Sequence, residues 1–253
     1  MESISMTAKE LVVLAAKLGA STFYGVSDPF RGMSRGEIRA ELPELQQQSE
    51  ARGLARIGFD ESFQVKEEVS ELINPCAMCE RYVVIDAVDA GRRRLKEILY
   101  GKEKNCVLLR KFADGAVELQ KITVENYRKI IMSKFFMYSM GENLQSGSIM
   151  LRHRWLKDWK ESGADNIQQL IEIGCPADMA VILQKGIHRQ CTYLSMVRVD
   201  LQENSCVTLQ CLTDPSGRIL LKSTNEDGEE FCNISWLCDQ DAIGEMDKLF
   251  HGF

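Results

Sequence analysis

The sequence has few of the residues that enzymes commonly use at their active sites. Its 253 residues include only three histidines, and these are scattered at His153, His188 and His251. No G-x-S-x-G element accompanies them, and neither the Walker nor the dinucleotide form of a glycine-rich phosphate loop is present. Nucleotide chemistry is therefore unsupported. We predict no catalytic residue, no cofactor and no metal site, and we expect a protein that is not an enzyme.

Long apolar runs and an excess of basic charge are also missing. No stretch approaches about 18 uninterrupted apolar residues, so no transmembrane helix or membrane insertion is predicted. The N-terminal segment carries Glu2, Lys9, Glu10 and Lys17, which leaves neither a basic n-region nor a clean apolar h-region, and no signal peptide is predicted. The net charge of −6 argues against nucleic acid as a partner. We expect a cytoplasmic protein.

The composition that remains is that of an ordinary globular protein. Hydrophobic residues make up 45% of the chain and charged residues 27%, and the length suits one large domain or two intimate halves. The nine cysteines are an odd number without an export signal, so we predict reduced and mostly buried thiols rather than a disulfide framework.

Two capping boxes predict helices near the N-terminus. Thr7 with Glu10 precedes one amphipathic pattern, and Ser34 with Glu37 precedes a second, more polar one. Because proline is disfavoured inside a helix, Pro43 predicts a break in the second helix.

The next helix is predicted to begin at an Asp60 cap and to end at Pro75, since Val65, Val69 and Leu72 recur at helical spacing. A pair of helices followed by strands could be taken for a winged helix-turn-helix. The second helix, however, carries five acidic residues against a single lysine, which argues against DNA binding.

A series of short extended runs follows. Strands are predicted at 81–88, 105–112 and 116–122, whereas 92–100 fits a strand or a helix. Turn residues between the runs, including Asp-Ala-Gly and Ala-Asp-Gly, predict antiparallel hairpins rather than parallel crossovers.

The second part of the chain repeats this order. Helices are predicted from Thr123 to about Met137, around Trp155 and Trp159, and from an Asp165 cap; extended runs follow, the first of them DMAVILQK, and Asp239 is predicted to cap a last helix. We therefore predict an α+β fold of two pseudo-symmetric halves, 1–122 and 123–253. In each half helices precede an antiparallel meander, and the two sheets join or pack centrally.

The only C-x-x-C element, Cys76 to Cys79, is predicted to have a packing role. A redox pair usually opens a helix, whereas this one closes a helix, and no second pair supplies the remaining zinc ligands. A Cys191–His188 nucleophile pair could be assembled in space, but nothing local supports it. A cysteine-dependent redox or metal protein remains an alternative.

Three charged stretches are interpreted as structural. LRHRWLKDWK at 151–160 mixes basic residues with two tryptophans, whose spacing of four is more typical of a core-facing helix than of a nucleic-acid or membrane surface. Arg92, Arg93 and Arg94 are predicted to flank a strand as a solvated cluster. The acidic NEDGEE is predicted to be an exposed hairpin turn.

Four segments carry a family resemblance: TAKELVVLAAKLGA, ARGL after a polar helical stretch, ELINP followed by the strand RYVVIDA, and the hairpin KNCVLLRKFADGAVELQKIT. Together they resemble the EspG family, the secretion-associated chaperones of type VII (ESX) systems. The resemblance implies a cytosolic, non-enzymatic α+β protein that binds a helical secreted protein, either a type VII substrate or a WxG-like hairpin.

The chain also departs from the family pattern. It is richer in Lys, Ile, Met and Cys, as in a divergent relative from another bacterial group, and the loop from Tyr100 to Lys104 is short where family members can carry a longer one. No partner-binding residue is carried over from the family. The alternative is a non-enzymatic scaffold or regulatory binding protein that shares only the fold.

Overall fold

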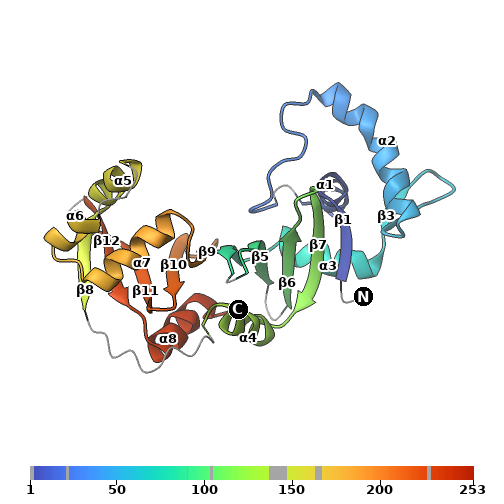
Figure 1. Ribbon diagram of the computed structural model, residues 1–253. Coiled ribbons are helices and arrows are strands. Elements are labelled where there is room, and N and C mark those ends of the chain that lie inside the picture. The colour runs from blue at the N-terminus through green and yellow to red at the C-terminus, as the bar shows by residue number, and fades with distance from the viewer. Residues whose placement is uncertain are drawn as a thin grey trace.

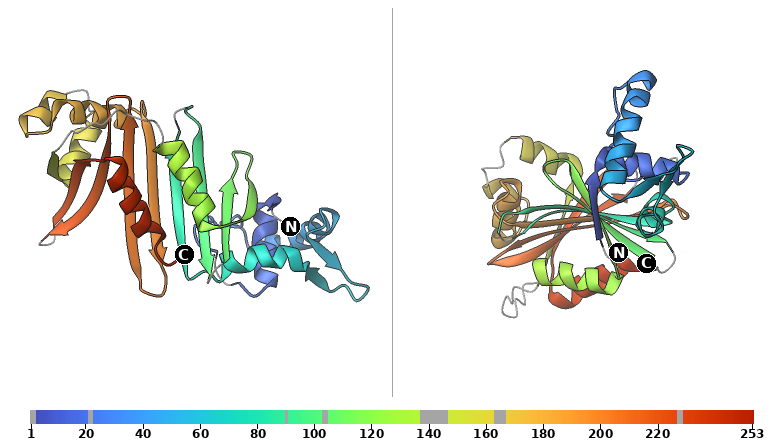
Figure 2. Two further views of the ribbon diagram at one scale, coloured as in Figure 1. Left: turned by 90° about the horizontal axis from the view of Figure 1, so that it is seen from below. Right: turned by 90° about the vertical axis from the view of Figure 1, so that its right-hand side faces the viewer.

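A single antiparallel sheet runs the length of the molecule (Figures 1 and 2). The computed structural model describes residues 3–20, 23–89, 91–102, 105–136, 147–162, 167–226 and 229–253. The sheet has ten strands in the order β1-β7-β6-β5-β4-β9-β10-β11-β12-β8. They are β1 Ser3–Thr7, β4 Arg81–Val88, β5 Arg94–Lys102, β6 Asn105–Lys111, β7 Ala116–Ile122, β8 Ser148–Arg152, β9 Thr192–Asp200, β10 Ser205–Asp214, β11 Gly217–Glu226 and β12 Glu229–Trp236.

The centre of the sheet joins the early and late parts of the chain. β4 pairs with β9 in antiparallel register, with Val84 opposite Val197 and Asp86 opposite Ser195. A separate small hairpin pairs β2 (Ala55–Ile57) with β3 (Phe63–Val65). The predicted strands at 81–88, 105–112 and 116–122 are confirmed, and the ambiguous segment 92–100 forms a strand from Arg94 onward, β5.

Eight helices surround the sheet in the described part of the chain. They are α1 Ala8–Lys17, α2 Arg35–Ala51, α3 Glu67–Ala77, α4 Val124–Phe135, α5 His153–Glu161, α6 Ile167–Glu172, α7 Ala177–Ile187 and α8 Asp239–Phe250. The two capping boxes are confirmed: Thr7 and Ser34 each accept a hydrogen bond from a backbone N–H three residues on, and Glu10 and Glu37 complete them.

One face of the sheet, called here the covered face, carries α4 and α8 across its middle. Tyr127 and Ile131 of α4 and Met246 of α8 are fully buried against strand residues such as Leu99 and Met196. Figure 2 shows these two helices lying side by side in front of the central strands. They form one continuous apolar layer that spans both parts of the chain.

The opposite face, called here the open face, is covered only towards its two ends. α1 and α3 pack over β5 to β7 through residues such as Leu14 and Ile73, and α5, α6 and α7 pack over β10 to β12 through residues such as Trp159 and Ile182. The central strands β4 and β9 lie between these two helical layers.

Three expected helix boundaries are wrong. The helix that begins after Ser34 continues through Pro43 as α2, because buried Leu45 and Ser49 hold the turns beyond the proline. The next helix begins at Glu67 rather than after Asp60, since Phe63–Val65 is occupied by pairing with β2. It also continues through Pro75 to Ala77 rather than ending at the proline, because Pro75 and Cys76 are buried in its last turn.

Two further expectations need correction in the second part. DMAVILQK lies in helix α7, where Met179, Ile182 and Leu183 bury one face at helical spacing. The side chain that caps α8 belongs to Cys238, one residue before Asp239. Asp165, the turn between β11 and β12 and the end of the Tyr100–Lys104 loop lie outside the described residues.

The structure thus has the predicted α+β class and one large antiparallel sheet. Equivalence of the halves 1–122 and 123–253 stays a prediction. Seven of the nine cysteines are buried, and Cys206 and Cys238 are exposed. Within the described ranges, no helix is long and apolar enough to cross a membrane.

Candidate binding surface on the open face

Four valines line the uncovered middle of the open face. Val84 and Val88 of β4, and Val197 and Val199 of β9, are half-buried and belong to none of the three hydrophobic clusters of the fold. Directly paired residues of antiparallel strands share a face, and Val84 is opposite Val197. We call these four residues the valine patch. Val84, Val197 and Val199 lie next to one another, and the polar pair of Asp86 and Ser195 separates them from Val88. In the described part of the chain no helix packs over these valines.

The loop before α2 borders the patch on one side. The ring of Tyr24 stacks on that of Tyr82 with centroids 5.5 Å apart, and the Tyr100 hydroxyl donates a 2.6 Å hydrogen bond to the Tyr24 carbonyl. Gly25 has a φ of +72°, and a Cβ there would lie 2.6 Å from Cδ1 of Ile98. The positive φ favours glycine here, and any larger residue would also have to displace the end of the Ile98 side chain.

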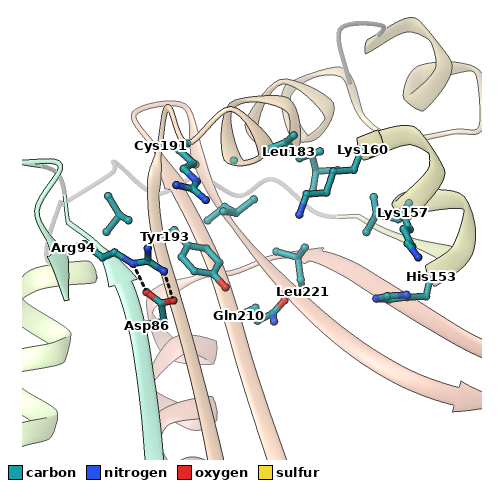
Figure 3. Close-up of a pocket in the computed structure, with 16 residues that line it drawn as sticks. Asp86, Arg94, His153, Lys157, Lys160, Leu183, Cys191, Tyr193, Gln210 and Leu221 are labelled. Atoms are coloured by element: carbon teal, nitrogen blue, oxygen red, sulfur yellow. Dashed lines mark hydrogen bonds and ion pairs between the residues drawn. The ribbon is translucent and has the colours of Figure 1, made fainter. Parts of the chain in front are cut away.

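A cavity of about 530 Å³ borders the patch on the other side, between α5, α7 and the central strands (Figure 3). Its apolar wall on the sheet comes from Val88, Tyr193, Leu212 and Leu221. Val88 belongs to both surfaces, so the valine patch and the cavity are continuous.

Basic side chains from three elements line the same cavity. They are Arg94 from β5, His153, Lys157 and Lys160 from α5, and Arg189 from the loop after α7. Among the described residues of the lining, the single acidic one is Asp86, which accepts hydrogen bonds from Nε of Arg94 at 3.2 Å and Nη2 of Arg94 at 2.8 Å. Because that pair neutralises itself, the remaining lining carries a surplus of positive charge.

The arginine cluster at 92–94 does more than flank a strand. Arg92 donates hydrogen bonds to the carbonyls of Arg189 and Gln190, while Nε of Arg93 lies 3.1 Å from Oδ2 of Asp89. Arg92 therefore ties the turn before β5 to the loop after α7 and fixes one rim of the cavity.

Helix α5 carries its tryptophans and its lysines on different sides, and the tryptophans face the core as their spacing predicts. Trp159 is buried, and its ring stacks on that of Trp155 with centroids 6.3 Å apart. Lys157 and Lys160 lie on the side that lines the cavity. The core role of the tryptophans is confirmed, whereas the place of the lysines at a cavity is not visible in the sequence.

The cysteine candidates lie where thiol chemistry is disfavoured. Cys76 and Cys79 are both buried at the end of α3, and burial raises the pKa of Cys76 well above its ordinary value and that of Cys79 to about 11. Burial likewise raises the pKa of Cys191 to about 11, and His188 is exposed at the end of α7. These three thiols therefore stay protonated near neutral pH, as suits a packing role.

The histidines are not brought together. His153 lines the cavity with Nδ1 3.8 Å from Oε2 of Glu230, while His188 and His251 are exposed after α7 and α8. No group of three or more His, Cys, Asp or Glu suited to holding a metal ion occurs among the residues that the structure describes.

The valine patch could have been suspected from its strands. In RYVVIDAV and SMVRVD the apolar residues occupy both faces, although the alternation of a half-solvated strand would place polar residues on one. That excess indicates a second apolar surface. Its position beside the cavity depends on the pairing of β4 with β9, which the local sequence does not specify.

Comparison with solved structures identifies a protein of the same fold. EspG5, described as a type VII secretion system chaperone of Mycobacterium tuberculosis in a structure of its complex with a PE25–PPE41 dimer, matches over 99% of this chain and 98% of its own, with a TM-score of 0.64 and 14% sequence identity. No protein-family model matches the sequence, and no curated protein does either.

Proposed function

Because the chain shares its fold with a type VII secretion chaperone, we propose that it is a cytosolic, non-enzymatic chaperone or adaptor for a helical export substrate of a type VII-like system. The likeness extends over nearly the whole of both chains, so it concerns the entire architecture rather than one common motif. The EspG-like features of the sequence and the fold agree on this assignment.

The valine patch is the single observation that carries the proposal beyond the fold. A helical export substrate exposes apolar surface that would otherwise associate with itself, and a chaperone lowers that risk by covering it. Val84 and Val197 offer such cover on the paired central strands, between helical layers that leave them half-buried. We infer that a helix or helical hairpin of the substrate lies along this strip.

We further propose that 1–122 and 123–253 are equivalent halves of one domain. The order of the sheet supports this, since each outer strand pairs with the last strand of a four-strand meander: β1 with β7, and β8 with β12. The first strands of the two meanders, β4 and β9, then meet at the centre. The substrate surface would lie on the junction of the halves.

Co-expression tests the function directly. The chain is produced with small helical proteins encoded beside its gene, and the soluble fraction is analysed by size exclusion with light scattering. The chaperone assignment predicts a stoichiometric complex heavier than the 28.7 kDa chain and a substrate that is soluble only in its presence. A chain that elutes alone, or only as its own dimer, with every such neighbour would favour the scaffold alternative instead.

A further inference from the structure

The charge of the cavity beside the valine patch is opposite to that of the molecule as a whole. The chain carries a net charge of −6, yet the described lining outside the Arg94–Asp86 pair holds Lys157, Lys160 and Arg189 with no acidic residue. Lys157 lies 3.8 Å from Glu161 on the same helix, and both side chains are about two-thirds exposed, so this pair does little to neutralise it. Neither Lys160 nor Arg189 has an ion-pair partner in the described part of the chain.

The apolar wall of the cavity places a second requirement on any ligand that binds there. Val88, Tyr193, Leu212 and Leu221 form a surface that water covers poorly, and Figure 3 places the Tyr193 ring between the Arg94–Asp86 pair and the lysines of α5. A small inorganic anion could meet the basic rim but would leave this wall exposed. A peptide segment that combines an apolar side chain with carboxylates satisfies both.

We propose that the cavity receives an acidic–apolar segment of the helical substrate, with an aliphatic or aromatic side chain against Val88 and Tyr193 and flanking carboxylates near Lys157, Lys160 and Arg189. This inference rests on the proposed function and adds the chemistry by which the substrate is selected. The continuity of the cavity with the valine patch through Val88 lets one helix occupy both. The patch supplies apolar contact, and the basic rim fixes the orientation of the helix and rejects basic sequences.

A charge-reversal pair tests the inference. Lys157→Glu/Lys160→Glu reverses two charges at the rim, and Lys17→Glu/Lys134→Glu makes the same net change at exposed positions of α1 and α4. Affinity for the co-purified helical substrate is measured by calorimetry at low and high salt for both variants and the wild type. Thermal melts of the free variants establish that each is folded.

The rim variant is expected to bind the substrate about tenfold more weakly than the wild type and to lose most of the salt dependence, whereas the control variant stays within about twofold. Equal affinities for the two variants would overturn the acidic–apolar inference and leave the chaperone function standing, provided that the wild type binds. A wild type that binds no helical neighbour overturns both.

Discussion

The hydroxyl of Tyr127 donates a 2.7 Å hydrogen bond to Oε2 of Glu97 beneath the covered face of the sheet. Both residues are buried, and Nε of Arg110 lies 2.8 Å from the other carboxylate oxygen. Burial, followed by the charge of Glu97, raises the pKa of Tyr127 well above its ordinary value, so the phenol remains a donor. The contact fixes α4 to β5, the strand beside the central pair.

Tyr127→Phe should lower the free energy of unfolding by about 1–3 kcal/mol, because it leaves a buried carboxylate oxygen without its donor. Tyr193→Phe, at a half-buried tyrosine on the other face, is the matched control and should change stability by less than about 0.5 kcal/mol. Urea denaturation of both variants measures the difference. Equal stabilities would show that the Tyr127–Glu97 contact contributes nothing to holding α4.

Asp200 links stability to pH at the end of the central strand pair. Backbone N–H groups of Glu203 and Gln202 donate to Oδ1, each at 3.1 Å, and Arg198 and Arg81 lie 3.2 and 3.4 Å from Oδ2. The hydrogen bond from the Glu203 backbone lowers the pKa of Asp200 below its ordinary 3.8. Burial acts in the opposite direction, and Arg198 adds to the lowering.

Because the pKa of Asp200 is lower in the folded state, the contacts of the ionised carboxylate stabilise the fold fully above the pKa of an ordinary aspartate. This stabilisation is lost as pH falls through the folded-state pKa. Wild-type stability should therefore fall below about pH 4, and Asp200→Asn should show a shallower fall over the same range. Asp158→Asn, at an exposed position of α5, should follow the wild-type slope. Parallel slopes for wild type and Asp200→Asn in denaturation at pH 5, 4 and 3 would remove Asp200 as the cause.

The valine patch predicts a selective loss of binding. Val197→Gln places a polar side chain at the centre of the patch and should weaken substrate binding by about tenfold or more, since apolar contact at the middle of an interface dominates its energy. Val207→Gln is the matched control, because Val207 is an exposed valine on the neighbouring strand and faces the opposite side of the sheet. Calorimetry that finds the same affinity for both variants would rule out the patch as the docking surface.

Local sequence signals specify most of the elements but not their limits. The capping boxes at Thr7 and Ser34 and the strand 81–88 involve contacts within a few residues, and all are found where predicted. The helix break predicted at Pro43 was wrong, because the effect of a proline on a helix depends on the residues that pack beyond it. The edge strands β1 and β8 were missed because five residues next to a helix carry too little alternation to be recognised.

The candidate surface depends on contacts between distant parts of the chain. Val84 and Val197 become neighbours only through the register of β4 with β9, and Lys160 reaches the same region only because Trp159 anchors α5 over the far strands. Sequence patterns indicate that each strand has two apolar faces and that α5 has a basic side. They do not indicate that these surfaces meet.

Two exposed thiols allow the most direct test of the docking surface. Cys206 lies on β10 directly opposite Val199, at the edge of the valine patch, and Cys238 lies at the start of α8 on the covered face. The other seven cysteines are buried and should react slowly in the folded protein. Alkylation of Cys206 and Cys238 is followed by mass spectrometry with and without the co-purified helical substrate.

With substrate well above its Kd, the rate at Cys206 should fall by at least about tenfold while the rate at Cys238 stays unchanged, because only the free protein exposes the patch. A substrate complex in which Cys206 reacts at the rate of the free protein, or in which Cys238 is the protected thiol, would contradict docking on the open face.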